Sequence, residues 1–191
     1  MRLFIAVDLS EEQKSYLTDL QSELKSSLNN VKWVDVYALH ITLKFLGEVE
    51  TIPHEKLFSL LHQAVEKFRP FEFNLKRLGV FPNKSRPRVI WTGVDKGNER
   101  LIELSTRINQ ELKKEGFEEE KKAFIPHVTL GRIKKFDRND PLNQILDIYK
   151  DFSTPDAQAT CVNLYQSILS QKGANYVSLQ KIKFCAGESD K

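Results

Sequence analysis

Two histidines of this chain lie in nearly identical short sequences. Residues 39–47 read LHITLKFLG, and residues 124–132 read FIPHVTLGR. In both, a histidine is followed by a β-branched residue, a threonine and a leucine, which gives the pairs His40/Thr42 and His127/Thr129. The chain holds only 4 histidines. Chance repetition of the pattern is on the order of 1 in 10,000, so the repeat is informative.

Both sequences read as β-strands, and this reading places the histidine and threonine of each motif on one face. Residues i and i+2 share a face of a strand. Ile41 and Val128 then point to the core, and a polar face carries the imidazole and the hydroxyl. A lone histidine on a strand is more often structural than catalytic. Packing of the core, however, does not explain why histidine and threonine occur together on the polar face of both strands.

The residue types in this pair of motifs predict acid–base chemistry at a phosphate. Two imidazoles can act as general base and general acid near neutral pH. Threonine hydroxyls can donate hydrogen bonds to the non-bridging oxygens of a phosphate. Two histidines alone would leave a zinc site short of ligands. We therefore expect phosphodiester cleavage with no metal and no cofactor.

Apolar periodicity predicts the elements that position these motifs. We expect helices capped at Ser10 and at Thr51, a third helix over 101–112 that ends at Gly116, and a short helix over 142–149. We expect strands over 2–9, 31–35, 39–46, 71–81, 89–94, 125–133, 158–169 and 175–184. Strands and helices interleave, which favours an α+β fold. The offset between His40 and His127 is 87 residues, nearly half the chain, and indicates a duplicated unit.

The composition fits one domain over residues 1–191, built as two lobes. Hydrophobic residues make up 40% of the chain, and the net charge of +3 is too mild to require a nucleic-acid partner by itself. No apolar run reaches the length of a membrane span, and the stretch Leu3 to Val7 is too short for a signal peptide. Cys161 and Cys185 are not at metal-ligand spacing. We expect a cytoplasmic monomer with both thiols reduced.

The two motifs resemble the signature sequences of a known family. LHITLKFLGE (39–48) and FIPHVTLGR (124–132) are similar to those of the two-histidine (2H) phosphoesterases, and more narrowly of the RNA 2′,3′-cyclic phosphodiesterases, once described as 2′-5′ RNA ligases. The resemblance covers nearly the whole chain, with support from residues 1–9, 79–94 and 168–179. It implies a bilobal duplicated fold, in which two antiparallel sheets line a central cleft and the helices lie outside.

The resemblance also implies an activity and roles for five residues. The reaction would be hydrolysis of an RNA 2′,3′-cyclic phosphate to a 2′-phosphomonoester. His40 would be the proton donor to the leaving 3′ oxygen, and His127 would be the proton acceptor that activates water. Thr42, Thr129 and Arg132 would bind the substrate phosphate. In a regular strand Arg132 would face away from the second histidine, so its role requires a twist or bulge nearby.

Other basic and aromatic residues are weaker candidates for contact with the substrate. Ile125 stands where many relatives of this family carry a basic or polar residue. Lys44 would continue the polar face of the first motif and could meet phosphate charge. A basic rim for an RNA end could come from Arg86, Arg88, Lys134 and Lys135. Stacking on a base could come from Trp33, Phe45, Phe81 or Trp91, although core packing is the commoner role of aromatic residues. His54 and His62 are expected at the surface or cap of a helix.

Two alternatives remain open at this stage. The same site could act on 2′-5′ linkages or on nucleotide cyclic phosphates. The cleft could instead bind RNA ends without turnover, with the histidines as ligand contacts.

Overall fold

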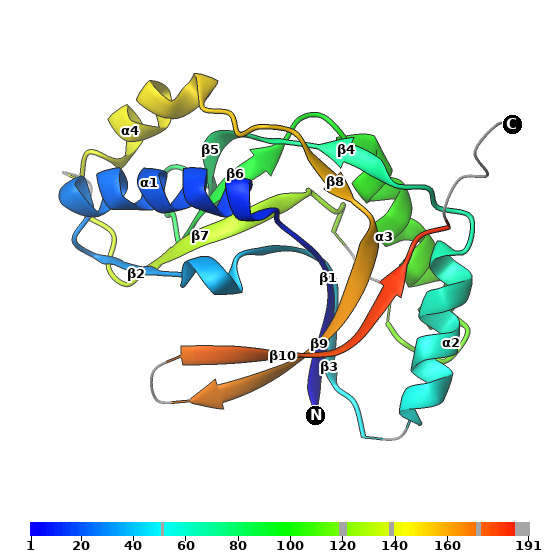
Figure 1. Ribbon diagram of the computed structural model, residues 1–191. Coiled ribbons are helices and arrows are strands. Elements are labelled where there is room, and N and C mark those ends of the chain that lie inside the picture. Colours follow the sequence, from blue (N-terminus) through cyan, green and yellow to red (C-terminus); the bar gives the residue numbers. More distant parts are fainter. Residues whose placement is uncertain (51, 119–121, 138–139, 171–172, 186–191) are drawn as a thin grey trace, which may run out of the picture.

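The structure is a computed structural model that describes residues 1–50, 52–118, 122–137, 140–170 and 173–185 (Figure 1). Four α-helices, two short 3-10 helices and ten strands alternate along this part of the chain. In order they are β1 (Arg2–Asp8), α1 (Glu11–Ser27), β2 (Val31–Trp33), η1 (Val36–Ala38), β3 (His40–Glu48), α2 (His54–Val65), β4 (Phe71–Phe73), β5 (Leu75–Phe81), β6 (Val89–Val94), α3 (Asn98–Lys113), β7 (His127–Ile133), α4 (Leu142–Ile148), η2 (Tyr149–Asp151), β8 (Ala157–Ala159), β9 (Cys161–Ser170) and β10 (Gly173–Lys183).

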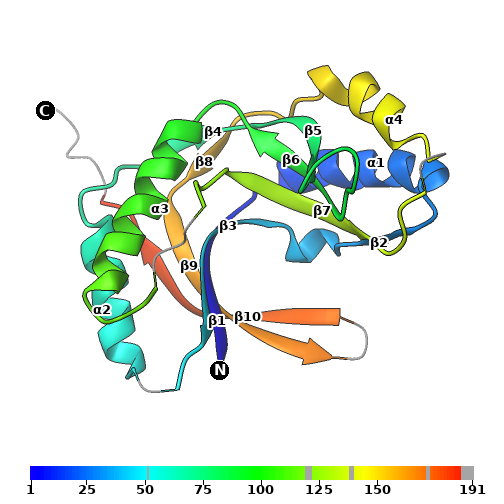
Figure 2. The same cartoon turned by 180° about the vertical axis from the view of Figure 1, so that it is seen from behind.

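One antiparallel sheet of eight strands dominates the fold. Its order is β10-β9-β1-β3-β7-β6-β5, with β2 also paired to β7. The strands β3 and β7 pair only at Ile41 and Val128, and this junction is the seam of the sheet. The two sheets that the family resemblance implied are therefore two half-sheets that meet at the seam. Helices α2 and α3 lie outside the half with β1 and β9, and α1 and α4 lie outside the other half (Figures 1 and 2).

The predicted duplication is visible in the positions of the elements. Three pairs of elements start 87 residues apart. They are β1 and β6 (residues 2 and 89), α1 and α3 (residues 11 and 98), and β3 and β7 (residues 40 and 127). Ile41 and Val128, which meet at the seam, have the same offset. About this point the strands β3, β1 and β9 on one side correspond in order to β7, β6 and β5 on the other. A pseudo-two-fold axis therefore passes through the seam.

The two structural lobes are not the two halves of the sequence. Strand β5 comes from the first half but pairs with β6 of the second half. Strand β9 comes from the second half but pairs with β1 of the first half. Each half of the chain thus completes the sheet of the other. The short strands β4 and β8 also pair across the halves, in a separate two-stranded sheet.

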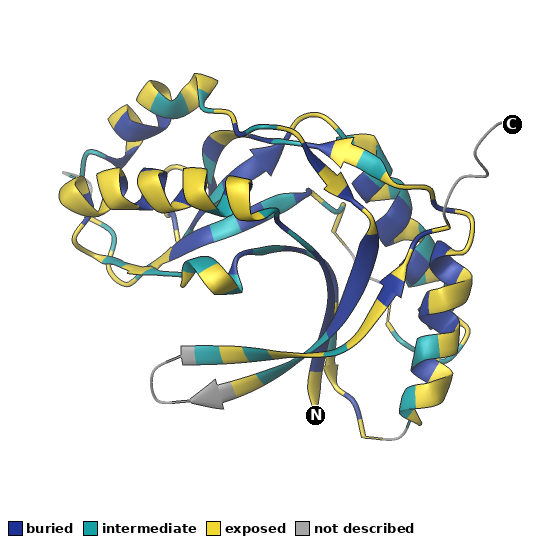
Figure 3. Cartoon of the chain, viewed as in Figure 1, coloured by how far each residue is buried: buried dark blue, intermediate teal, exposed yellow. Residues whose placement is uncertain are grey.

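Each helix packs on the sheet through a buried face (Figure 3). Helix α1 begins with a capping box between Ser10 and Gln13 and buries Leu17, Leu20 and Leu24. Helix α3 buries four apolar residues at helical spacing, Leu101, Leu104, Ile108 and Leu112. Burial of one such side chain contributes about 1.5–3 kcal/mol. These faces fix the helices against the strands that carry the motifs.

Some predicted boundaries differ from the structure. The single strand expected over 71–81 is two strands, because the backbone and side chain of Asn74 bond the turn at Asp95 and Lys96 instead of continuing the ladder. The strand expected over 158–169 is likewise split into β8 and β9. Strand β7 begins at His127, directly after Pro126, which has no N–H to donate.

The helix cap expected at Thr51 lies outside the described part of the chain, and the described helix α2 begins at His54, directly after Pro53. Among the helices that are described, none is long and apolar enough to span a membrane.

Candidate active site

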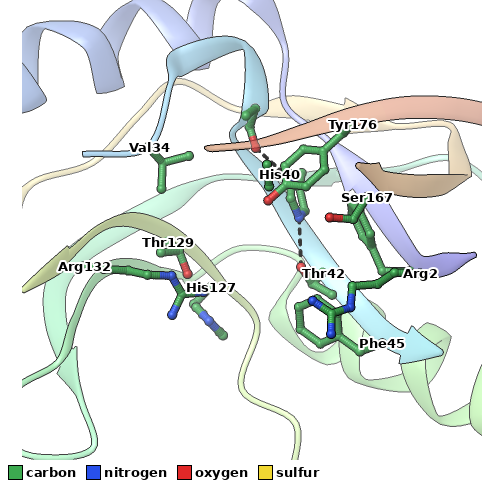
Figure 4. Close-up of a pocket in the computed structure, with 13 residues that line it drawn as sticks. Arg2, Val34, His40, Thr42, Phe45, His127, Thr129, Arg132, Ser167 and Tyr176 are labelled. Atoms are coloured by element: carbon green, nitrogen blue, oxygen red, sulfur yellow. Dashed lines mark hydrogen bonds between the residues drawn. The ribbon is translucent and has the colours of Figure 1, made fainter. Parts of the chain in front are cut away.

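The two motifs line one cavity of about 330 Å³ between the half-sheets (Figure 4). Strand β3 brings His40 and Thr42 to it, and β7 brings His127 and Thr129. All five site residues expected from the sequence lie on its wall, since Arg132 also lines it. The remaining lining residues are Arg2, Phe4, Val34, Ala38, Phe45, Ser167, Ala174 and Tyr176.

Each imidazole is anchored by a backbone carbonyl two residues before it. His40 Nδ1 lies 2.8 Å from Ala38 O, and His127 Nδ1 lies 2.6 Å from Ile125 O. A carbonyl only accepts hydrogen bonds, so Nδ1 carries the proton in both rings. Nε2 is therefore the atom that gains or loses a proton. On His40 it lies 2.9 Å from Thr42 Oγ1, in the cavity.

Aromatic side chains hold both rings in place. Phe4 stacks on His40 with ring centroids 4.9 Å apart, and Tyr176 meets the same ring edge-on at 5.3 Å. Phe81 meets His127 edge-on at 5.0 Å, and Trp91 lies 6.1 Å from it. Phe4 and Trp91 are 87 residues apart, so the duplication extends to these supports. Aromatic contacts of this kind restrict ring orientation.

The two histidines differ in their electrostatic surroundings. Burial lowers the pKa of both below the ordinary value, and the carbonyl bonds oppose this effect. The Asp8 carboxylate also raises the pKa of His40, whose strand partner it is. Asp8 accepts hydrogen bonds from Tyr165 (2.7 Å) and Asn163 (2.8 Å). Its counterpart Asp95 is exposed and bonds Lys76 instead, and no carboxylate opposes the effect of burial on the pKa of His127 as Asp8 does for His40.

A bulge at the leucine of each motif changes which of the following residues face the cavity. The register of β6 with β7 passes from Trp91↔Thr129 to Ile90↔Gly131, so Leu130 is an extra residue. This is the irregularity that Arg132 needed in order to share the cavity with His127. The register of β1 with β3 passes likewise from Ala6↔Thr42 to Ile5↔Lys44, and Leu43 is the extra residue.

The first bulge overturns the expected position of Lys44. The regular alternation would have kept this lysine on the cavity face, but the extra residue turns it away and brings Phe45 there instead. Lys44 is buried, at 3% exposed, and Nζ donates to Glu118 O at 2.5 Å. Phe45 is 64% exposed and lines the cavity. It occupies the position equivalent to Arg132, 87 residues away.

The geometry of two anchored histidines in one cavity agrees with what comparison with known proteins finds. A family model described as LigT-like phosphoesterase matches residues 7–91 and 93–176, and each stretch holds one motif. The chain belongs to this family.

Relatives named RNA 2′,3′-cyclic phosphodiesterase match this LigT-like phosphoesterase over most of its length. One from Archaeoglobus fulgidus is 38% identical and covers 94% of this chain and 98% of its own. Another from Methanocaldococcus jannaschii is 36% identical, with coverage of 92% and 96%. A crystal structure from Thermus thermophilus superposes with a TM-score of 0.83 at 26% identity, over 98% of this chain and all of that one.

Other residues singled out in the sequence of this LigT-like phosphoesterase lie outside the cavity. His54 begins α2 and His62 is exposed on it, as the sequence indicated. Trp33 packs against the hydrophobic core and lines a second groove on the Lys25 side of the cavity. Within the described residues, no group of three histidine, cysteine, aspartate or glutamate side chains could hold a metal ion.

Asp8, Tyr165 and Tyr176 are among the site residues that were not identified from the sequence. Asp8 ends an apolar strand and resembles an ordinary strand-end carboxylate. Tyr165 lies on β9, which pairs with β1, and Tyr176 lies on β10, which pairs with β9; this pairing brings both rings to the first motif. The equivalence of residues 8 and 95, both aspartate and 87 apart, is the signal that could have indicated Asp8.

Proposed function

We propose that this LigT-like phosphoesterase hydrolyses the 2′,3′-cyclic phosphodiester at RNA ends to a 2′-phosphomonoester by acid–base catalysis. In this scheme His127 accepts a proton from water, whose oxygen attacks phosphorus. The bond from phosphorus to the 3′ oxygen breaks. His40 gives its proton to that oxygen, which leaves as the 3′ hydroxyl.

The observation that carries this proposal is the matched anchoring of the two imidazoles. With Nδ1 bound to a carbonyl, the neutral ring presents a lone pair at Nε2 and is a base. The protonated ring presents N–H at the same atom and is an acid. The same anchoring therefore lets one histidine act as the base and the other as the acid, on the wall of one cavity. An in-line displacement at phosphorus requires a base for the attacking water and an acid for the leaving oxygen.

Asp8 supports the assignment of the acid to His40. A general acid must hold its proton before the reaction, and a nearby carboxylate favours the charged imidazole. No equivalent carboxylate contributes to the pKa of His127, which suits a base. The negative phosphate of the bound substrate would oppose the effect of burial and raise the pKa of both rings toward the ordinary value.

The remaining cavity residues suit the rest of the substrate. Thr42 and Thr129 can donate to the non-bridging oxygens, where negative charge concentrates. Arg132 can bind these oxygens with two parallel N–H groups. Phe45 and Tyr176 offer faces on which a terminal base can stack.

The test is a turnover assay with a short RNA that ends in a 2′,3′-cyclic phosphate, in the presence of EDTA. We expect a 2′-phosphate product, and loss of nearly all turnover in His40→Ala and His127→Ala with folding unchanged. A 3′-phosphate product would reverse which oxygen leaves. Activity that disappears on chelation would contradict the metal-independent mechanism. Tight binding without turnover would favour an RNA-end-binding protein.

A basic groove beside the cavity favours RNA ends over mononucleotides as the substrate. It has a volume of about 680 Å³, and Arg132 lines both it and the cavity. All charged residues on its wall are basic, namely Arg86, Arg88, Arg132 and Lys134. None of these has an ion-pair partner within the part of the chain that the structure describes. Backbone phosphates upstream of the cyclic end can therefore bind there without displacing a carboxylate.

This choice of substrate predicts a length-dependent effect. Arg86→Ala with Arg88→Ala should lower kcat/KM for an oligonucleotide and leave a mononucleoside 2′,3′-cyclic phosphate unaffected. The salt dependence of oligonucleotide binding should weaken by about one unit of slope per lost phosphate contact. The matched control is Lys25→Ala with Lys32→Ala, on the other flank of the cavity. An equal effect on both substrates would contradict the proposed path of the RNA strand.

A further inference from the structure

The two bulges share a second feature, a hydrogen bond from a buried helix side chain. Ser105 Oγ of α3 donates to the carbonyl of Leu43 at 2.9 Å. Gln21 Nε2 of α1 donates to the carbonyl of Leu130 at 2.9 Å. Leu43 and Leu130 are the extra residues of the two bulges. Both bulges are therefore held at the same atom, although the two donors are unrelated in type.

The donors are buried polar residues on helix faces that are mostly apolar. Gln21 is 3% exposed and Ser105 is 2% exposed, and each lies among the buried leucines that pack its helix on the sheet. Burying an amide or a hydroxyl is unfavourable unless it is hydrogen-bonded. Gln21 Nε2 makes a further bond to Val34 O at 2.9 Å, and Val34 also lines the cavity. The polar groups are thus committed to the backbone around the motifs.

The donors act across the duplication. Helix α1 belongs to the first half of the chain, but Gln21 holds the bulge of the second motif. Helix α3 belongs to the second half, but Ser105 holds the bulge of the first motif. The bulge determines whether the residue at His+4 or the residue at His+5 faces the cavity. In the second motif these are Gly131 and Arg132, and in the first they are Lys44 and Phe45.

We propose that Gln21 and Ser105 are positioning residues that fix these bulges, so that Gln21 acts through Arg132 and Ser105 acts through Phe45. The inference rests on the proposed function, because it assigns both residues to the substrate site of that reaction. Loss of the Gln21 donor lets the strand return toward regular pairing and withdraws the guanidinium from the phosphate. Loss of the Ser105 donor withdraws the ring that faces the base.

The test is a pair of double-mutant cycles. Gln21→Leu should lower kcat/KM by roughly 10-fold to 100-fold, the cost of misplacing a binding group by about 1 Å. It should cause no additional loss in an Arg132→Ala background, but the full loss in a Phe45→Ala background. Ser105→Ala should show the reverse pattern. A structural role alone would give the same loss in every background, and additivity in both cycles would overturn the proposal.

A matched control separates positioning from stability. Gln13 is a second buried glutamine on α1, and its Nε2 bonds Phe73 O and Pro155 O, away from the motifs. Gln13→Leu should destabilise the fold to a similar extent and leave kcat/KM unchanged below its unfolding temperature. Gln21→Met, which keeps the side-chain length without the donor, is the second variant if Gln21→Leu does not fold.

A second readout does not depend on turnover. The same cycles can be measured by equilibrium binding of an RNA with a 2′-phosphate end. If the wild type does not hydrolyse the cyclic phosphate, the proposed function fails, and the coupling of Gln21 to Arg132 is still decided by this binding. Absence of coupling there would overturn the positioning role independently.

Discussion

Gly79 of β5 lies directly opposite Trp91 of β6, and the space between them leaves no room for a side chain. A Cβ at Gly79 would lie 2.2 Å from Trp91 Cζ2, whereas ordinary van der Waals contact begins at 3.4 Å. In Gly79→Ala the indole must therefore retreat by about 1.2 Å, the difference between these distances. The indole stacks on Phe81 at 5.0 Å, and both rings contact His127. The displacement reaches the proposed general base.

We expect Gly79→Ala to lower kcat on a cyclic-phosphate RNA by up to about 100-fold, the cost of a misplacement near 1 Å. Overpacking should also lower the free energy of unfolding by about 1–3 kcal/mol. The assay is steady-state turnover below the unfolding transition, together with urea denaturation of the same preparation.

A graded control lies on the same ring. A Cβ at Gly93 would lie 3.2 Å from Trp91 Cζ3, so Gly93→Ala requires a shift of only tenths of an ångström and should retain most activity. Trp91→Phe should relieve the clash in the Gly79→Ala background, because the smaller ring vacates the indole atoms concerned. Full activity in a folded Gly79→Ala protein would refute the claim that the aromatic cluster positions His127.

Three further predictions concern charge, phosphate binding and the seam. Burial lowers both histidine pKa values, so the bell-shaped pH profile of kcat/KM should lie below the position that ordinary imidazoles would give. Asp8→Asn removes the charge that favours protonated His40, so the descending limb should move to lower pH while the ascending limb of His127 stays. Arg132→Ala should lower kcat/KM by roughly 10-fold to 100-fold, as loss of a charged hydrogen bond worth about 1.5–3 kcal/mol implies, and Arg132→Lys should recover only part of it in the same assay. Ile41→Ala should lower the free energy of unfolding by about 2–5 kcal/mol in urea titration, because it empties a fully buried position at the seam.

Local sequence information was sufficient for the centre of the site. Strand alternation placed His40 with Thr42 and His127 with Thr129, and the repeat indicated that the two strands work together. The pairing of each histidine with its threonine uses residues two positions apart, and the backbone geometry of a strand places such residues on the same face. The motifs also located the duplication, because their offset recurs in the elements around them.

The bulges could not be predicted from local sequence in this way: the second was required only by the role that the resemblance implied for Arg132, and the first was not expected. Leu43 and Leu130 are apolar residues in apolar strands, and nothing in them marks an extra residue. The donors that hold them, Gln21 and Ser105, lie 109 and 62 positions away in the sequence. A regular alternation therefore assigned Lys44 to the cavity, where the structure has Phe45.

The exchange of strands between the halves was also beyond local reasoning. Strands β5 and β9 have apolar faces that fit any suitable neighbour, and their partners are chosen by the packing of the whole sheet. The carboxylate of Asp8 becomes a site residue only because this exchange brings β9 beside β1, with Tyr165 and Asn163 on it.

The axis at the seam has a consequence for the history of the reaction. Two identical ancestral chains, meeting as Ile41 and Val128 now meet, would have presented two equal histidines to a substrate. A cyclic phosphate could then have bound in either of two opposite orientations, with the donor role set by how it happened to lie. Fusion of two such chains would have allowed the surroundings to differ, as they do here, where a carboxylate acts on His40 and Arg132 lies on the strand of His127. Exchanging those neighbours, and not the histidines, is the change that would reverse the preferred orientation of the substrate.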